Sequence, residues 1–343
     1  MRSLFQQRRS CFYRAHTDLA ALSGPGFSGF PNNPCLTMSV DFRHVPVLAD
    51  EVTGFLRPAP GRTIMDGTLG GGGHSSLLLG GGARVIGFDR DPEALAHCAG
   101  LLSGHGALFS AVRANFSEAA ERLMSMGIAS LDGILLDLGV SSRQLDTPER
   151  GFSFLREGPL DMRMSAGEGL TAEDLVNTAP AEELARIFRL YGEEPRAMQY
   201  AARIVAARSR SPITSTLQLA GLIAGRRTAP RHPATRVFQA LRIAVNDEIG
   251  ALERALPALS SLLSPGGRLA VITFHSLEDR IVKQFLRRHS APEIDDPTWP
   301  AARPNPERIF TLLTTRSVTA SPAELSSNPR SRSARLRVAE RLP

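Results

Sequence analysis

A glycine-rich stretch from Thr63 to Ser76, Thr-Ile-Met-Asp-Gly-Thr-Leu-Gly-Gly-Gly-Gly-His-Ser-Ser, constrains the fold more than any other segment of the 343-residue chain. A short apolar run ending in Asp66 precedes the glycines, and a helix-forming run follows them. This order predicts a buried strand, a tight turn and a helix. Glycine is required where such a turn adopts positive φ and where a ligand lies against bare backbone. The first N–H groups of the helix would face that ligand.

A second apolar run, residues 83–88, ends in Asp89, roughly 20 residues after the loop opens. An acid at this place binds the ribose hydroxyls in nucleotide-binding α/β folds. No Gly-Lys-Ser/Thr follows the glycines, which excludes a P-loop. The pattern Asp-x-Thr-x-Gly-x-Gly over residues 66–72 resembles the first motif of Rossmann-like S-adenosylmethionine methyltransferases, with Thr68 replacing the usual first glycine. An ordinary strand–helix turn is the alternative, but Asp89 favours nucleoside binding.

The composition is strongly biased toward arginine. Lysine and arginine total 40 against 34 acids, a formal net charge of +6, and Lys283 is the single lysine. Arginine suits phosphates and stacked bases, although a GC-rich genome would produce the same bias. Cys11, Cys35 and Cys98 lie far apart without a Cys-x-x-Cys, so neither a zinc site nor a disulfide framework is predicted, and we expect no metal. No apolar run approaches the roughly 18 residues of a membrane span.

Residues 1–40 differ from the rest of the chain. An arginine-rich, acid-poor leader of this kind is typical of mitochondrial transit peptides. An upstream start codon is the alternative, because Met38 begins a plausible N-terminus. We favour the start at Met38, and we expect the leader to be disordered and dispensable for fold and activity. Its charged residues are Arg2, Arg8, Arg9, Arg14 and Asp18.

Strands alternate with helices from His44 onward, which predicts an α/β fold with a mostly parallel, doubly wound sheet. The last two strands would form an antiparallel end. Ligands of such sheets bind outside the carboxyl ends of the strands. The predicted strands are 62–65, 83–88, 107–112, 132–137, 268–274, 308–315 and 334–341. The predicted helices between the first four strands and before them are 48–56, 92–101 and 117–126, and residues 138–154 and 291–306 are expected to be loops.

The strand pattern stops between residues 148 and 232, which predicts a helical inserted domain between core segments 41–147 and 233–343. Its helices are expected at 171–177, 180–191, 194–208 and 214–224. A long helix, 234–263, returns to the core and is ended by Ser-Pro-Gly-Gly at 264–267. Between Pro195 and Asn246 there is no acid. A long run of one charge is typical of polyanion-binding surfaces, and an arginine-rich helix surface is the alternative. The arginines of this run are Arg196, Arg203, Arg208, Arg210, Arg226, Arg227, Arg231, Arg236 and Arg242.

Several longer motifs point to one family. They are His-Val-Pro-Val-Leu (44–48), Asp-Gly-Thr-Leu-Gly-Gly-Gly-Gly-His-Ser (66–75), Asp-Arg-Asp-Pro (89–92), Leu-Leu-Asp-Leu-Gly-Val-Ser-Ser (135–142), Arg-Gly-Phe-Ser-Phe (150–154), Gly-Pro-Leu-Asp-Met-Arg-Met (158–164), Tyr-Gly-Glu-Glu (191–194), His-Pro-Ala-Thr-Arg (232–236), Phe-Gln-Ala-Leu-Arg-Ile (238–243), Phe-His-Ser-Leu-Glu-Asp-Arg (274–280) and Asn-Pro-Arg-Ser-Arg-Ser (328–333). Together they resemble the small-subunit (16S) ribosomal RNA cytosine-N4 methyltransferases, bacterial enzymes with a mitochondrial relative. The resemblance covers about His44 to Arg341.

This resemblance implies a Rossmann-like class I methyltransferase that uses S-adenosylmethionine on a cytidine of the decoding region. It implies ribosomal RNA or the assembled small subunit as the partner and no association with a membrane. The expected location is the bacterial cytoplasm, or the mitochondrion if the leader is a transit peptide. A homodimer is left open. The cofactor contacts that it implies are Gly72, Gly73, His74, Asp89, Phe116, Asp137 and Gln144.

The chemistry expected of such an enzyme is mainly positioning, because a cytosine amine is a poor nucleophile whose lone pair is delocalised into the ring. Many amino-methyltransferases carry an Asp/Asn/Ser-Pro-Pro-aromatic segment after strand four, whereas this chain has Asp-Leu-Gly-Val-Ser-Ser over residues 137–142. Asp137, Ser141, Ser142 and His275 are therefore candidates for base contacts, and none is assigned as catalytic. His275 is equally a candidate for a structural cap, and Ser276 is also a plausible cap of the helix that follows.

Two other classes of protein remain as alternatives. An NAD-dependent oxidoreductase would need a hydride-handling residue such as a Tyr-x-x-x-Lys pair, and none of the three tyrosines has a lysine four residues on. A non-catalytic RNA-binding assembly factor is the second, and the cofactor signature argues against it.

Overall fold

The computed structural model describes residues 46–224, 232–295, 298 and 300–343. All of them lie in one unit, residues 43–343. The leader and Arg226, Arg227 and Arg231 fall outside the described residues, so the expectations for them stay predictions. No helix in the described ranges has the length and apolar character needed to cross a membrane.

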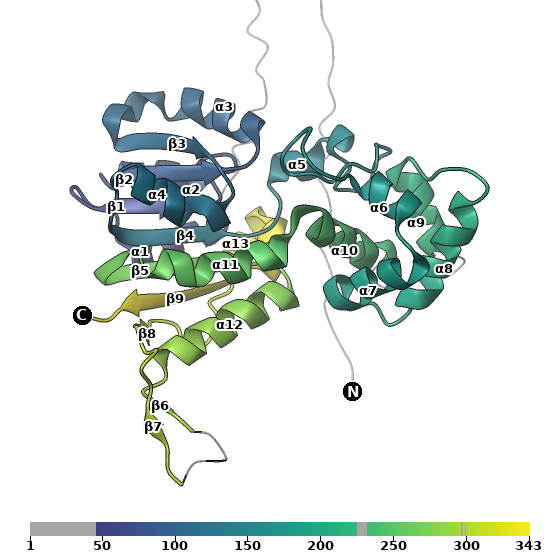
Figure 1. Cartoon of the computed structure of the whole chain (residues 1–343). Coiled ribbons are helices and arrows are strands. Elements are labelled where there is room, and N and C mark those ends of the chain that lie inside the picture. The colour runs from purple at the N-terminus through teal and green to yellow at the C-terminus, as the bar shows by residue number, and fades with distance from the viewer. Residues whose placement is uncertain (1–45, 225–231, 296–297, 299) are drawn as a thin grey trace, which may run out of the picture. The chain divides into compact units, whose positions relative to one another are not determined.

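Seven strands form one sheet in the order β3-β2-β1-β4-β5-β9-β8 (Figure 1). The pairs from β3 to β5 are parallel, and β9 is antiparallel to both β5 and β8. The predicted mostly parallel sheet with an antiparallel end is therefore confirmed. The strands are β1 (Thr63–Asp66), β2 (Arg84–Asp89), β3 (Phe109–Arg113), β4 (Leu131–Asp137), β5 (Leu263–Thr273), β8 (Phe310–Leu312) and β9 (Arg335–Arg341).

Helices cover both faces of this sheet, as the parallel strands require, because their side chains are apolar on both sides. One hydrophobic cluster joins Phe88 and Leu136 to Leu256 and Val282. It includes side chains of α4 (Ala119–Ser125), α11 (Glu248–Ser260) and α12 (Ser276–Ser290). The cluster on the other face contains side chains of α1 (Ala49–Leu56), α2 (Gly73–Gly80) and α3 (Pro92–Leu101).

A third hydrophobic cluster holds the helices that follow β4 in the chain. They are α6 (Ala172–Thr178), α7 (Ala181–Gly192), α8 (Ala197–Arg208), α9 (Thr216–Ala224) and α10 (Ala234–Asn246), close to the predicted ranges. Val237, Phe238 and Leu241 of α10 are buried in this cluster. The packing therefore groups α10 with the preceding helices, although the predicted boundary at residue 232 places it in the core.

The single long helix predicted over 234–263 is wrong, because α10 ends at Asn246 and α11 begins at Glu248. Asp247 between them has φ 49°, a left-handed conformation that aspartate tolerates better than most residues. The break is needed because α10 packs among the helices and α11 packs on the sheet. Residues 264–267, which were expected to end that helix before a strand at 268–274, lie within β5, which starts at Leu263, and its pairing with β4 is irregular there.

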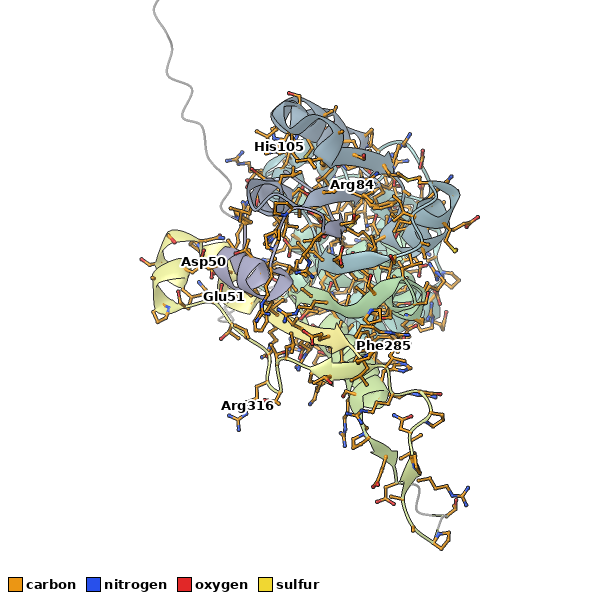
Figure 2. The ribbon with its side chains drawn as sticks, turned by 90° about the vertical axis from the view of Figure 1, so that its left-hand side faces the viewer. Asp50, Glu51, Arg84, His105, Phe285 and Arg316 are labelled. Atoms are coloured by element: carbon orange, nitrogen blue, oxygen red, sulfur yellow. The ribbon has the colours of Figure 1, made fainter. Side chains whose placement is uncertain are left out.

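Two stretches predicted to be loops contain short elements. Residues 142–146 form α5 (Ser142–Asp146), which begins with a capping box between Ser141 and Gln144. Within 291–306, β6 (Glu293–Ile294) and β7 (Arg303–Pro304) form a ribbon that projects from the sheet in both views (Figures 1 and 2). These elements are too short to show a hydrophobic period in the sequence, which is why they were not predicted. The ribbon follows α12, whose Phe285 packs against Phe310 of β8 (Figure 2).

Candidate active site

A cavity of about 540 Å³ runs along the carboxyl ends of the parallel strands. Its walls include the glycine loop after β1 and one or more residues that follow each of β2, β3, β4 and β5. Among the described residues, six of the seven expected cofactor contacts line it, and Gly72 is the exception: Gly73, His74, Asp89, Phe116, Asp137 and Gln144. The fold thus brings together side chains that are far apart in the sequence.

Gly72 packs against α3. Its φ of 77° is left-handed, and a Cβ there would lie 2.9 Å from Sγ of the buried Cys98 on α3. Cys98 in turn donates to the carbonyl of Gly70. Only glycine permits this close approach of the loop to α3. A Cβ at the neighbouring Gly71 would meet no atom within 4 Å, so the loop leaves bare backbone facing the cavity.

Asp66 at the end of β1 is 1 % exposed, and its hydrogen bonds fix the glycine loop. Its carboxylate accepts hydrogen bonds from Ser75 Oγ at 2.7 Å and from the Thr68 N–H at 3.2 Å. Burial raises the pKa of Asp66, against the opposing effects of His74 and these donors. The sequence-predicted strand end is therefore a structural anchor for the loop.

His74 and Asp137 form a close pair inside the cavity. His74 Nε2 lies 3.6 Å from Asp137 Oδ2, and the imidazole is 6 % exposed. Burial alone would lower the pKa of His74, but the carboxylates of Asp137 and Asp66 outweigh it and raise that pKa. Both His74 ring nitrogens and Asp137 Oδ1 are buried without a hydrogen-bond partner within the described residues. Buried polar atoms are nearly always bonded, so these atoms indicate a polar ligand.

Asp89 lies where the ribose acid was expected. One oxygen accepts the Gly70 N–H and the other accepts the Asp91 N–H, each at 2.8 Å. Burial raises the pKa of Asp89, while these two donors oppose the shift. A carboxylate offers about four acceptor positions, so Asp89 can still receive two hydroxyls. Phe116, which follows β3, adds an apolar wall.

Gln144 reaches the cavity from α5, but both ends of its amide are engaged. Its Oε1 accepts the Ser141 N–H, and its Nε2 donates to Asp91 at 3.1 Å. Asp91 also accepts from Arg150 Nη1 at 2.7 Å. The predicted contact Gln144 is therefore part of a network that ties the segment after β4 to the start of α3.

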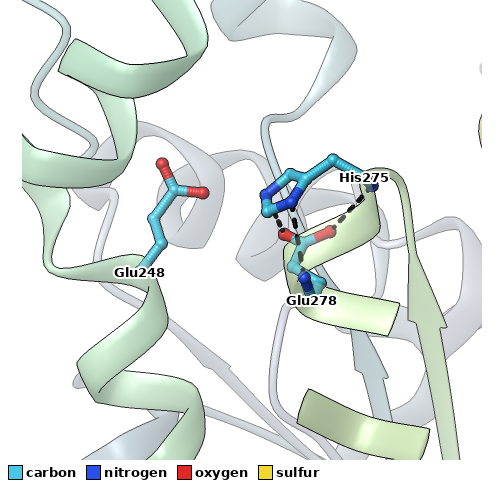
Figure 3. Close-up of side chains that lie close together, drawn as sticks. All are labelled: Glu248, His275 and Glu278. Carbon is cyan, nitrogen blue, oxygen red and sulfur yellow. Dashed lines mark hydrogen bonds and ion pairs between the residues drawn. The ribbon is translucent and has the colours of Figure 1, made fainter. Parts of the chain in front are cut away.

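Four residues from α10, α11 and α12 form a charged group beside the cavity, which we name the carboxylate cluster: Arg242, Glu248, His275 and Glu278. Figure 3 shows Glu248 facing His275 and Glu278 across the gap between α11 and α12. Arg242 donates to both oxygens of Glu248, each at 2.8 Å. Arg242 belongs to the arginine run expected to bind RNA, but its guanidinium is held in a largely buried ion pair at the cavity.

Of the two residues expected as possible caps of α12, His275 is confirmed and Ser276 is wrong. His275 is the N-cap, and it forms a capping box with Glu278. Glu278 accepts the N–H groups of Phe274 and His275, whereas Ser276 Oγ donates to Glu193. The sequence did not lead us to predict Glu248 or Glu278 as cavity residues. A signal was present, because Glu278 lies in the Phe-His-Ser-Leu-Glu-Asp-Arg motif and Arg242, the partner of Glu248, lies in the Phe-Gln-Ala-Leu-Arg-Ile motif.

Comparison with known proteins decides between the remaining alternatives. Residues 41–342 match the family model described as the MraW methylase family. The chain belongs to this family. A ribosomal RNA small subunit methyltransferase H of Anaeromyxobacter sp. (strain K) is 52% identical over 310 residues, which cover 89% of this chain and 100% of the relative. The protein of the same name from Trichlorobacter lovleyi is 51% identical and covers 88% of this chain and 99% of its own.

Among solved structures, an rRNA methylase from Streptococcus thermophilus aligns over 88% of this chain and 99% of its own chain. The sequence identity is 12% and the TM-score is 0.41, so the structural similarity is weak. Family membership confirms the expected S-adenosylmethionine-dependent methyltransferase with a Rossmann-like sheet. It does not favour the oxidoreductase or the non-catalytic assembly factor.

The residues present fit this cofactor. Bare backbone at Gly70 and Gly71, an acid after β2 and an aromatic after β3 suit a nucleoside. The unpartnered atoms of His74 and Asp137 suit the polar groups of an amino acid. When bound, the cofactor supplies an electrophilic methyl group on a sulfonium. The individual contacts of Gly72, Gly73, His74, Asp89, Phe116, Asp137 and Gln144 with it stay predictions.

Proposed function

We propose that this protein methylates N4 of a cytidine in the decoding region of small-subunit ribosomal RNA. One observation carries the proposal. A single cavity contains the glycine loop, which suits a nucleoside, and the buried His74–Asp137 pair. The same cavity continues to the ends of the neighbouring strands β4 and β5, where further polar groups lie. The relatives named as small-subunit ribosomal RNA methyltransferases support the class of substrate.

The chain's own residues act mainly by positioning. A cytosine amine attacks only when its lone pair is turned out of conjugation, and carboxylate acceptors that bind its hydrogens favour that form. Asp137 lies at the tip of β4 with one unpartnered oxygen, so it is suited to hold a polar group at the reacting end of the cavity. Orientation of this kind contributes more to the rate than proton transfer does for such a reaction.

We further propose that residues 148–232 serve as an inserted RNA-binding domain. Arg196, Arg203 and Arg210 are exposed, and no acid stands between Pro195 and Asn246 in the sequence. Arg208 is engaged differently, because its guanidinium donates to the Val176 carbonyl at 2.7 Å. Exposed arginines without interspersed acids favour contacts with phosphates.

The substrate would be ribosomal RNA, free or within the assembled small subunit, and the relatives' bacterial origin favours action in the cytoplasm. The target base would leave its stack on either substrate, since the cavity lies at the carboxyl ends of the strands and is also lined by residues of α10 and α11. A homodimer remains a proposal that sedimentation of the pure protein would test.

Mass-spectrometric mapping of methylated cytidine, in cells with and without the gene, tests the function. Loss of one N4-methylcytidine from small-subunit ribosomal RNA is the expected result, and purified protein should restore it on either naked RNA or subunits. An unchanged methylation map, with an active protein present in the wild-type cells, would contradict the proposal.

A further inference from the structure

The carboxylate cluster has more negative charge than its fixed cation balances. Arg242 neutralises Glu248 through two hydrogen bonds of 2.8 Å, while Glu278 is 2 % exposed and has no arginine in direct contact among the described residues. Burial would raise the pKa of Glu278, but His275, Arg242 and the Phe274 N–H outweigh it and lower that pKa. Arg242, the arginine of the cluster, is paired with Glu248, and the partners of Glu278 in the described part of the chain are His275 and two backbone N–H groups.

Hydrogen-bond donors lie beside these carboxylates. His275 Nδ1 accepts the Glu278 N–H, so the neutral ring carries its proton on Nε2. That Nε2 is buried and has no hydrogen-bond partner of good geometry in the described ranges, although it lies 3.1 Å from Glu278 Oε1. Arg242 uses Nε and Nη2 for Glu248, which leaves Nη1. The cluster thus presents carboxylate acceptors next to N–H donors.

The order of the strands assigns this cluster to the substrate side of the cavity. Phe116 follows β3, Asp89 follows β2 and the glycine loop follows β1, so the nucleoside part of the cofactor belongs at that end. Asp137 follows β4, and its strand partner Ile272 lies three residues before His275. A base that meets the reactive methyl group from the other side therefore lies against the ends of β4 and β5, beside Phe274 and Glu278.

We propose that Glu248 and Glu278 are specificity-determining residues that accept the N4 hydrogens of the target cytosine, while Arg242 holds Glu248 and faces the acceptor edge of the base, and His275 holds Glu278. This inference rests on the proposed function and names the groups that select the base. Cytosine presents an amine beside ring acceptors, whereas uracil presents an oxygen in place of the amine. A carboxylate facing that oxygen is repelled, so the cluster selects against uracil.

A divalent cation is the competing occupant, because Glu248, His275 and Glu278 offer ligand atoms within 4.8 Å of one another. Two contacts argue against it. Arg242 already covers both oxygens of Glu248, and Glu278 Oε2 accepts two backbone N–H groups. A cation would lie beside the positive guanidinium of Arg242, which repels it, whereas an amine hydrogen can bond to the remaining lone pairs of the two carboxylates.

The test is equilibrium binding to the substrate that the mapping experiment shows to be methylated, free RNA or subunit, with cytosine or uracil at the mapped position. It is done with S-adenosylhomocysteine bound, so the measurement does not depend on turnover. We expect the wild type to bind the cytosine form at least about tenfold more tightly, the scale of one good base contact. Equal affinities for the two forms in the wild type would overturn the proposal without touching the assignment of the reaction.

Glu248→Gln and Glu278→Gln should each reduce the cytosine-to-uracil ratio to about one or below, since an amide donates to the uracil oxygen. Glu253→Gln, an exposed change on the same helix as Glu248, should keep the full ratio. Affinity for S-adenosylhomocysteine identifies variants that remain folded. Folded variants that keep the wild-type ratio would refute the assignment, as would a wild-type ratio that disappears when divalent metals are chelated.

Discussion

The hydroxyl of Thr68 accepts a hydrogen bond of 2.6 Å from the backbone N–H of Asp137. The contact joins the glycine loop after β1 to the tip of β4, where the proposed cofactor-binding and substrate-binding parts of the cavity meet. Thr68 departs from the glycine usual at this place in the motif, and the structure supplies the reason. A side-chain acceptor here holds Asp137 at a fixed position relative to His74.

Thr68→Val keeps the shape of the side chain but removes this acceptor. The partly buried Asp137 N–H is then unpaired, and we expect a loss of about 1–3 kcal/mol in the free energy of unfolding. Thr68→Ser should retain most of the stability, because it keeps the hydroxyl. Denaturant melts of the three proteins measure the effect, and a valine variant as stable as the serine variant would show that the hydrogen bond is unimportant.

Asp89→Ala should weaken S-adenosylmethionine binding by about 1.5–3 kcal/mol, the scale of losing a charge-assisted acceptor. Part of this loss is indirect, since Asp89 also accepts the Gly70 N–H and so shapes the loop. Calorimetric titration gives the affinity. Asp50→Ala, at the exposed start of α1 (Figure 2), is the matched control and should bind normally. Unchanged affinity in a folded Asp89→Ala protein would remove Asp89 from the site.

Stability should depend on pH through His74. Its pKa is raised above the ordinary 6.5, mainly by Asp137 and Asp66 acting against burial. The native state therefore binds the proton more tightly than the unfolded chain does. This contribution is fully present below about pH 6.5 and is lost as the pH rises through the native pKa of His74. Denaturant unfolding at a series of pH values should show stability falling in that window for the wild type, and the fall should be smaller for His74→Asn.

Exposed arginines of the helical segment should govern RNA binding. Changing Arg196, Arg203 and Arg210 together to glutamine should weaken binding and lower the salt slope by roughly 0.7–0.9 for each phosphate that is no longer neutralised. Cofactor affinity should not change. The control is a triple change at exposed arginines of β2, α4 and the loop after β8, namely Arg84, Arg122 and Arg316, two of which are labelled in Figure 2. An equal loss of affinity in both triple variants would mean that net charge alone binds the RNA.

Much of the fold was predictable because its signals are local. A glycine loop between an apolar strand and a helix, and an acid after the next strand, place the nucleoside end of the cavity without any tertiary information. The break at Asp247 was not predictable, since the apolar period continues through it and only the packing of α10 and α11 on different partners requires it. The carboxylate cluster was missed for a related reason: Glu248 meets His275 and Glu278 only through the placement of α11 beside α12.

The tight approach of Gly72 to Cys98 provides a natural reporter of loop opening. Burial and the nearby charges of Asp66 and Asp89 raise the pKa of the Cys98 thiol to about 12, so the thiol is unreactive while the loop is closed over it. A protein that starts at Met38 contains no other cysteine. The rate at which a thiol reagent labels it then measures how often the loop lifts from α3, and a ligand seated on the loop should slow that labelling in proportion to its occupancy.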